Sequence, residues 1–299
     1  MIDEMRHIDS DPPDHPSDGK LEGGVRLQKK IGAVVKHGGK FSPNRPLISV
    51  VTVVRNGADS IEKTIQSVLH QTFDNIEYII IDGSSTDGTL DIIRKYEDKV
   101  AYWLSEPDHG IYDAMNKSIA LVTGDWINFM NAGDLFYRDD VVADLFGGVE
   151  VTADVLYGDH QVIYDAKHSK VKKAGGIRDL WKGMMFCHQS LFVRTALMKS
   201  HNFNLRFKIA ADFEVLYTLF LSDCVFLDTG MVIASVSASG LSGKHTLQTV
   251  KEQWMVVRSL SNGIFKNMFY TYMMIMRLCK NMAKALLARD FLNRFRVRI

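Results

Sequence analysis

The chain has 299 residues, of which 46% are hydrophobic and 24% are charged, and its formal net charge is +1. This length suits one large domain or two small ones, and the composition is that of an ordinary globular protein. Because the net charge is close to zero, the chain as a whole has no electrostatic attraction to nucleic acid, and no nucleic-acid partner is expected.

The cysteines and the apolar runs indicate a cellular location. The three cysteines, Cys187, Cys224 and Cys279, form no CxxC pattern, so we expect reduced thiols in a cytoplasmic protein. The first residues are acidic and contain proline, unlike a signal peptide. No uncharged apolar run reaches the roughly 18 residues of a membrane-spanning helix.

The two ends of the chain differ in charge. Residues 1–20 hold six acidic and two basic side chains, whereas residues 264–299 hold eight basic and one acidic. This asymmetry indicates that the two ends have separate roles. Residues 1–45 also contain prolines and two Gly-Gly pairs without a lasting apolar period, which predicts a disordered or loosely attached arm.

Ordered structure is expected from Leu47 onwards, where apolar runs alternate with helical periods. Four buried strands are predicted, at residues 48–54, 76–81, 100–104 and 126–130. Helices are predicted after Ser60, which is expected to cap the first of them, and over residues 88–97 and 111–122. Strands that alternate with helices predict an α/β fold with a mostly parallel sheet flanked by helices.

The pattern is less regular beyond Asp134. A helix is predicted over residues 211–221, and the four lysines of residues 167–173 predict an exposed turn. Further strands are predicted at residues 155–157, 161–164, 186–193 and 225–238. We expect Gly158 to separate the first two of these strands.

Two acidic loops follow predicted strands, one at residues 82–89 and one at residues 131–134. Ligands of open α/β sheets bind beyond the carboxyl ends of the strands, so both loops should reach one edge. Asp82 in a turn rich in Gly, Ser and Thr can accept hydrogen bonds from a nucleobase or ribose. Asp134 offers hard oxygen atoms to a divalent cation that would also bind a ligand's phosphates. The alternative is that both are turn aspartates or helix caps.

Several other enzyme classes fit the sequence poorly. The loop after the first strand, residues 55–58, is not G-x-G-x-x-G, which argues against a dehydrogenase. Residues 240–245 lack the P-loop spacing, and no G-x-S-x-G occurs. Cys187 beside His188 is a poor nucleophile–base pair, because neighbouring residues of a strand point to opposite faces.

The residues at 48–56, the loop at 82–89 and Asp134 together resemble the nucleotide-binding half of family 2 glycosyltransferases, which have the GT-A fold. The run at 105–117 is similar to a narrower branch, the bacterial exopolysaccharide transferases of the colanic-acid type. This resemblance covers about residues 47–243. It implies a GT-A-like catalytic domain that is followed by a basic amphipathic helical tail. The expected segments are a nucleotide-sugar half at 46–137, an acceptor half at 138–243 and the tail at 244–299.

The resemblance implies an inverting transfer of a sugar from a nucleotide-diphosphate sugar. The acceptor would be a saccharide or a lipid-linked saccharide in cell-surface polysaccharide synthesis. Asp82 would contact the base, and four residues would lie beside the nucleotide sugar, namely Arg55, Asn56, Ser84 and Asn131. Asp134 matches the last acid of the family's metal motif. The earlier acids are Asn131 and Gly133 here, a reduced ligand set for the expected Mg²⁺ or Mn²⁺.

Asp212, at the start of the predicted helix 211–221, matches the family's catalytic base, with Glu214 as the second choice. His188 resembles a signature on the acceptor side, and a packed core histidine is the alternative. Two other functions remain open at this point: a different nucleotide-sugar enzyme, such as a nucleotidyltransferase, and a non-catalytic nucleotide-binding scaffold.

The C-terminal tail is predicted to be an amphipathic helix. An apolar stripe on it contains Phe265, Phe269, Tyr272, Met276 and Ala283. A basic cluster about 100° away contains Lys266, Arg277, Lys280 and Lys284. Such a helix suits peripheral contact with an anionic membrane surface, here at the inner face of the cell membrane. The alternative is that the stripe packs on the enzyme's own body or across a dimer.

Overall fold

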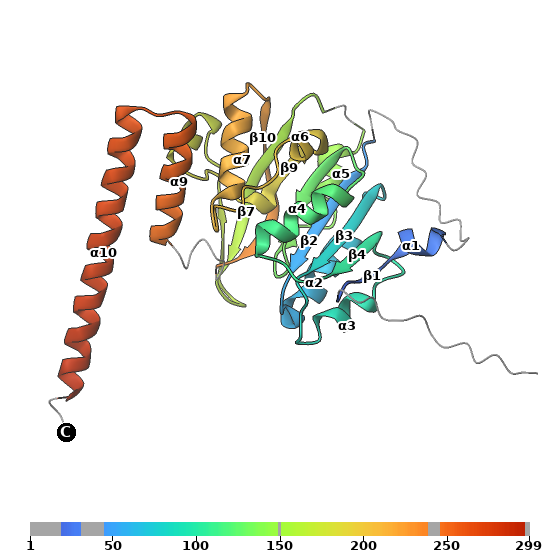
Figure 1. Cartoon of the computed structure of the whole chain (residues 1–299), viewed down its shortest axis with the longest axis horizontal. Helices are drawn as coiled ribbons and strands as arrows, with labels where there is room; N and C mark the ends of the chain where they lie inside the picture. The colour runs from blue at the N-terminus through green and yellow to red at the C-terminus, as the bar shows by residue number, and fades with distance from the viewer. Residues whose placement is uncertain (1–18, 31–44, 149–150, 239–245, 297–299) are drawn as a thin grey trace, which may run out of the picture.

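The structure is a computed structural model that describes residues 19–30, 45–148, 151–238 and 246–296 (Figure 1). Its ten strands form one sheet in the order β1-β4-β3-β2-β5-β9-β7-β10-β6, with β8 paired to β7. The strands are β1 Leu21–Gly23, β2 Ile48–Val54, β3 Ile76–Asp82, β4 Tyr102–Ser105, β5 Trp126–Phe129, β6 Leu135–Phe136, β7 Val155–Ile163, β8 Ser169–Lys172, β9 Leu191–Arg194 and β10 Phe226–Ser237.

Helices cover both faces of this sheet, and the two C-terminal helices lie beside it (Figure 1). The α-helices are α1 Val25–Lys30, α2 Ala58–Leu69, α3 Thr89–Arg94, α4 Ile111–Leu121, α5 Val141–Phe146, α6 Thr195–Ser200, α7 Ala211–Leu221, α9 Thr246–Leu260 and α10 Ile264–Arg296. Two 3₁₀ turns, η1 Ile177–Lys182 and η2 His188–Ser190, complete the set.

The predicted parallel strand pairing is confirmed in β4, β3, β2 and β5, which are parallel neighbours. Every residue of β2 is buried, as expected for a mostly apolar strand of a parallel sheet with helices on both faces. The second half of the sheet is mixed, because β9 is antiparallel to both β5 and β7. The α/β fold class is therefore as expected.

Three local predictions were wrong, each for a physical reason. β7 is one strand rather than two, because a Cβ at Gly158 would lie 2.5 Å from the carbonyl oxygen of Met231 on β10. This glycine permits close backbone approach rather than a turn. The lysine-rich segment is the exposed strand β8, and lysines are common on such edge strands. Ser60 is no cap, because α2 already begins at Ala58.

The expectation of a loosely attached N-terminal arm fails for residues 19–30. β1 pairs with β4, and Val25 on α1 is buried. Arg26 forms an ion pair with Glu77, a buried carboxylate that also accepts a hydrogen bond of 2.6 Å from Ser49. Residues 1–18 and 31–44 of the predicted arm lie outside the described residues.

The tail consists of two helices, α9 and α10, that lie side by side next to α7, with the far end of α10 extending away from the body (Figure 1). Phe269 packs edge-on against Trp181 of η1, and the buried Tyr270 donates its hydroxyl to the Trp181 carbonyl at 2.9 Å. One part of the predicted stripe therefore packs on the enzyme. Phe265, Tyr272 and other apolar side chains of α10 stay exposed. None of the described helices is both long and apolar enough to cross a bilayer.

Candidate active site

Parallel strands bring the two acidic loops to one edge of the sheet, as predicted. The loop after β3 begins at Asp82, and the loop after the parallel strand β5 contains Asp134. Asn56, in the loop after β2, is bound to the first of them: its N–H donates to Ser85 Oγ at 2.7 Å, and its Oδ1 accepts from the Thr86 N–H at 2.9 Å. Three consecutive strand ends thus form one continuous polar edge.

The Asp82 side chain is fully buried at this edge. Its carboxylate accepts hydrogen bonds from the Ser85 N–H at 3.0 Å, from Ser105 Oγ at 2.6 Å and from Ser85 Oγ. These bonds fix the shape of the loop that follows β3. Direct contact between Asp82 and a nucleobase stays a prediction, and Asp82 does not line the cavity described below.

Two of the predicted nucleotide-binding residues have unusual backbone conformations. Asn56 has φ 51° and Ser84 has φ 54°, in the left-handed region that residues other than glycine rarely adopt. Such strain persists only where the surrounding structure holds it, and it clusters at ligand sites. Arg55 is exposed beside Asn56. Like Asp82, these three residues lie outside the lining of the cavity.

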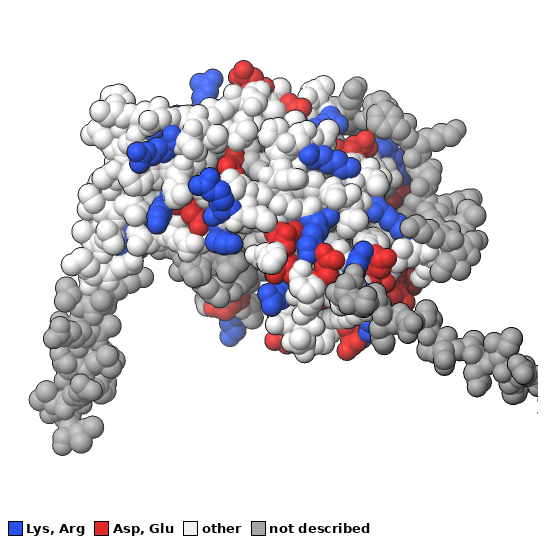
Figure 2. Space-filling view, in the orientation of Figure 1, with Lys and Arg blue, Asp and Glu red and all other residues white. Residues whose placement is uncertain are grey.

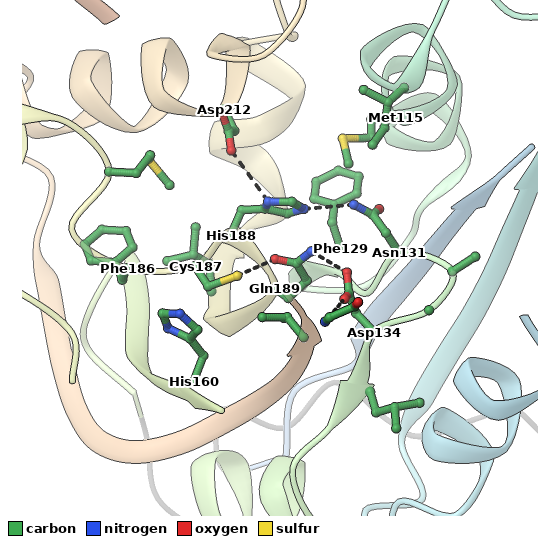
Figure 3. A pocket seen from close by; sticks show the side chains of 18 of the residues that line it. Met115, Phe129, Asn131, Asp134, His160, Phe186, Cys187, His188, Gln189 and Asp212 are labelled. Carbon is green, nitrogen blue, oxygen red and sulfur yellow. Dashed lines mark hydrogen bonds and ion pairs between the residues drawn. The ribbon is translucent and has the colours of Figure 1, made fainter. Parts of the chain in front are cut away.

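A cavity of about 1020 Å³ lies beside this edge, between the two halves of the sheet. Its lining comes from the start of α2, the loop at residues 131–134, the start of α4, η2 and the start of α7. Asn131, Asp134, His188 and Asp212 all reach into it (Figure 3). The structure therefore brings together four predicted site residues from three places that lie far apart in the sequence.

Asp134 lies on one wall of this cavity. Its Oδ2 accepts a hydrogen bond from Gln189 Nε2, and its Oδ1 accepts from the Ser237 N–H at 3.4 Å. Burial raises the pKa of the Asp134 carboxyl above its ordinary value, although Gln189 and His188 oppose the shift. Gly133 has φ 97°, which only glycine adopts easily, so the shape of the loop explains a glycine in place of an acid.

The residues of this loop fit a divalent cation. Asp134 supplies a carboxylate, and Asn131 Oδ1 is a buried oxygen without a hydrogen-bond partner among the described residues. Mg²⁺ is usually held by one or two carboxylates together with substrate phosphates and water, so this small set of ligands is sufficient. No group of three or more acidic, histidine or cysteine side chains that could hold a metal occurs in the described part of the chain.

Asp212, the second residue of α7, faces Asp134 from the other side of the cavity. Its Oδ1 accepts hydrogen bonds from the Phe213 N–H at 2.8 Å and from the Tyr112 hydroxyl at 3.1 Å. Burial, together with the charge of Asp212, raises the pKa of Tyr112 well above its ordinary value, so the phenol stays protonated as a donor. Oδ2 accepts no hydrogen bond among the described residues, which leaves it available to a ligand.

His188 connects the two walls of the cavity (Figure 3). Its Nε2 lies 2.9 Å from Asn131 Nδ2, and its Nδ1 lies 3.6 Å from Asp212 Oδ2, an ion pair when the imidazole is protonated. His188 therefore has polar partners on both sides, unlike the packed core histidine that was the alternative.

Two other residues considered from the sequence, Cys187 and Glu214, are not positioned to react with a bound substrate. Cys187 donates to Gln189 Oε1 at 2.5 Å, and burial raises the pKa of its thiol to about 12, so it is no nucleophile. The sequence-based argument against Cys187 was that it and His188 point to opposite faces of a strand. That argument was wrong, because His188 begins η2 and does not lie on a strand. Glu214 accepts a hydrogen bond from Asn204 at 3.1 Å and does not line the cavity.

Tyr112 and Gln189, which hold Asp212 and Asp134, were not among the predicted site residues, although the pair His188-Gln189 resembles the acceptor-side signature. Tyr112 stands in the distinctive run at residues 105–117, and Gln189 follows His188, so both lay within stretches already singled out. Their partners are 100 and 55 residues away in the sequence, and no local pattern predicts such a pairing.

Known proteins resemble this chain in sequence. The family model for glycosyl transferase family 2 matches residues 49–211, more than half of the chain. A PGL/p-HBAD biosynthesis glycosyltransferase of Mycobacterium tuberculosis is 32% identical over 175 residues, which cover 56% of this chain and 68% of that protein. The putative teichuronic acid biosynthesis glycosyltransferase TuaG of Bacillus subtilis is 36% identical over 104 residues, covering 34% of this chain and 41% of TuaG.

Solved structures share the fold at low sequence identity. The S. aureus TarS 1-349 complex with UDP-GlcNAc has a TM-score of 0.56 and 18% identity, covering 75% of this chain and 70% of that one. Mannosyltransferase PcManGT from Pyrobaculum calidifontis, in complex with GDP-Man and Mn²⁺, has a TM-score of 0.53 and 14% identity, covering 87% and 86%. With the family match over residues 49–211, these likenesses show that the chain belongs to glycosyl transferase family 2 and is a glycosyltransferase of the GT-A fold.

Proposed function

We propose that the protein is an inverting glycosyltransferase that moves a sugar from a nucleotide-diphosphate sugar to a saccharide or lipid-linked saccharide in cell-surface polysaccharide synthesis. The observation that carries this proposal is the pair of carboxylates, Asp134 and Asp212, on facing walls of one cavity. Displacement at an anomeric carbon needs a base on one face and stabilisation of the leaving group on the other. These two walls can supply both.

The reaction follows from this geometry. The acceptor oxygen attacks the anomeric carbon, the bond from that carbon to the diphosphate oxygen breaks, and the acceptor proton moves to Asp212 Oδ2. Oδ2 suits this role because it accepts no hydrogen bond among the described residues, and its nearest polar neighbour, His188 Nδ1, is 3.6 Å away. Tyr112 and the Phe213 N–H hold the other oxygen and so orient the carboxylate. A single displacement inverts the configuration of the sugar. His188 is an acceptor-side residue beside the base, and Glu214 is the weaker candidate.

The donor would lie along the edge formed by the strand ends. Arg55, Asn56, Asp82 and Ser84 would contact or shape the site of the nucleoside, and Asn131 would lie beside the sugar diphosphate. In support, TarS and PcManGT were solved with UDP-GlcNAc and GDP-Man, which are nucleotide-diphosphate sugars. The catalytic domain at 46–243 would thus consist of a donor half at 46–137 and an acceptor half at 138–243.

A divalent cation, Mg²⁺ or Mn²⁺, would be held by Asp134 and Asn131. Such an ion neutralises negative charge on a leaving diphosphate. Gln189 would orient the Asp134 carboxylate, because its amide already donates to Asp134 Oδ2. Lys63, which lines the same cavity, would add a fixed positive charge near the diphosphate.

A donor screen tests this proposal. The protein is incubated with UDP-glucose, UDP-GlcNAc, GDP-mannose or dTDP-rhamnose, with glycoside and lipid-linked acceptors, and nucleotide release is measured with and without Mn²⁺. We expect release of a nucleoside diphosphate together with a glycosylated acceptor. Release of a sugar 1-phosphate with transfer of the nucleoside monophosphate would indicate a nucleotidyltransferase. Donor binding by titration without any turnover would indicate a non-catalytic scaffold.

The exposed face of α10 supports a peripheral contact with the inner face of the cell membrane. Its exposed apolar side chains include Ile264, Phe265, Met268, Tyr272, Ile275 and Met276. The described part of α10 is drawn mostly in white in Figure 2, without acidic side chains. Residues 264–299 hold eight basic and one acidic side chain, so anionic lipid would attract the same helix.

We expect the variant Phe265→Asp/Tyr272→Asp to lose binding to vesicles of phosphatidylglycerol and phosphatidylcholine. Each side chain loses apolar burial worth about 1.5–3 kcal/mol, so the partition coefficient should fall at least about tenfold. Co-sedimentation measures this loss. Leu227→Asp, at an exposed leucine of β10, is the matched control and should bind as wild type does. Equal sedimentation of all three proteins would contradict the membrane contact.

A further inference from the structure

A buried carboxylate of α9 reaches the loop that leads into the catalytic helix α7. Glu252 is 7% exposed, and its Oε2 accepts hydrogen bonds from the Ile209 N–H at 2.9 Å and the Ala210 N–H at 3.1 Å. Its Oε1 accepts from Gln248 Nε2 at 2.8 Å. Ile209 and Ala210 directly precede α7, whose second residue is Asp212. A residue from outside the family match at 49–211 thus holds the backbone next to the proposed base.

The same stretch of backbone is held from its opposite side by α4. The Tyr112 hydroxyl lies 2.7 Å from the Ile209 carbonyl oxygen, and it also lies 3.1 Å from Asp212 Oδ1. Glu252 therefore fixes the N–H of Ile209, while the single hydroxyl proton of Tyr112 is shared between the Ile209 carbonyl, at the shorter distance, and the carboxylate of Asp212. The first N–H groups of a helix have no partner within the helix, and a buried carboxylate satisfies the groups that precede α7 here.

The helix that carries Glu252 is itself well anchored. Trp254 Nε1 donates to Asn267 Oδ1 of α10 at 2.9 Å, which ties the two tail helices together. Lys266 Nζ of α10 donates to the hydroxyl of Tyr217 on α7 at 3.1 Å. The pair of helices therefore packs as one unit against α7, and a shift of α9 would move the residues that precede Asp212.

We propose that Glu252 is a positioning residue for Asp212, which it holds through the backbone of Ile209 and Ala210. This inference rests on the proposed role of Asp212 as the base. A base must lie within hydrogen-bond reach of the hydroxyl that it deprotonates, and a displacement of about 1 Å can cost about 100-fold in rate. Glu252 limits such displacement through two bonds to the backbone.

Turnover and donor affinity of four variants test the proposal. Glu252→Ala removes the carboxylate that accepts the two backbone hydrogen bonds, and Glu252→Asp draws that carboxylate back. In both variants we expect kcat to fall at least about tenfold with unchanged Kd for the donor. Glu252→Gln keeps an oxygen that can accept from both N–H groups, and it should restore most of the turnover. Gln253→Ala, at another buried polar residue of α9 that faces Gly183, is the control and should keep the wild-type kcat. Wild-type kcat in Glu252→Asp would overturn the proposal even if Glu252→Ala fails to fold.

A double-mutant cycle with Asp212→Asn separates positioning from a general structural role. If Glu252 acts through Asp212, Glu252→Asp should lower the residual turnover of Asp212→Asn by less than about twofold. The same fold-loss in both backgrounds would overturn the positioning role. Near wild-type turnover in Asp212→Asn alone would instead show that the proposed base is wrong, so the two failures are distinguishable.

Discussion

We expect replacement of Asp212 by asparagine to lower turnover by about 100-fold or more and to leave donor affinity unchanged. Asparagine has nearly the same size and can still accept from Tyr112 and the Phe213 N–H, so the start of α7 keeps its shape. It cannot take the proton of the acceptor hydroxyl, and only the chemical step is impaired. Steady-state kinetics together with calorimetric titration of the donor measure both quantities.

The control for this variant is Asp223→Asn, at an exposed aspartate just beyond the C-terminal end of α7. It makes the same chemical change far from the cavity and should keep wild-type turnover. A near wild-type rate in Asp212→Asn would remove Asp212 from the role of base. Glu214→Gln would then be the next variant to measure, although Glu214 does not line the cavity.

Replacement of Asp134 by alanine has the second large expected effect. We expect turnover to fall by about 100-fold or more and the remaining rate to become insensitive to added Mn²⁺ or to EDTA, because the only carboxylate of the loop is lost. Asp139→Ala, at an exposed aspartate of the following segment, should keep both the rate and any response to metal. A rate of Asp134→Ala that still rises with Mn²⁺ would contradict the role of Asp134 as the metal ligand.

The central sheet was predictable because its signals are local. β2 and β3 are mostly apolar, β-rich segments of seven residues each, and every β2 residue is indeed buried. The helix that carries Asp212 was predicted at residues 211–221, the bounds that α7 has. The edge shared by Asp82 and Asp134 followed from the rule that ligands bind beyond the carboxyl ends of parallel strands.

What could not be predicted depends on distant partners. Gly158 looks like a turn residue in the sequence, and only the backbone of β10 shows why it lies within a strand. Asp82 looks like an exposed ligand until Ser105 and Ser85 are seen to satisfy its carboxylate. Glu252 is 42 residues from Ala210, and nothing in the pattern of α9 indicates that it binds the backbone before the base.

The anomeric configuration of the product tests the central claim most directly. The claim is a single displacement in which Asp212 deprotonates the acceptor while the diphosphate leaves from the opposite face. With the donor that the screen identifies, proton NMR of the purified product gives the configuration of the new glycosidic bond. The account predicts a configuration opposite to that of the sugar in the donor, at a rate that depends on Asp212. A product with retained configuration would contradict it, because one displacement with one base cannot retain the configuration of the donor.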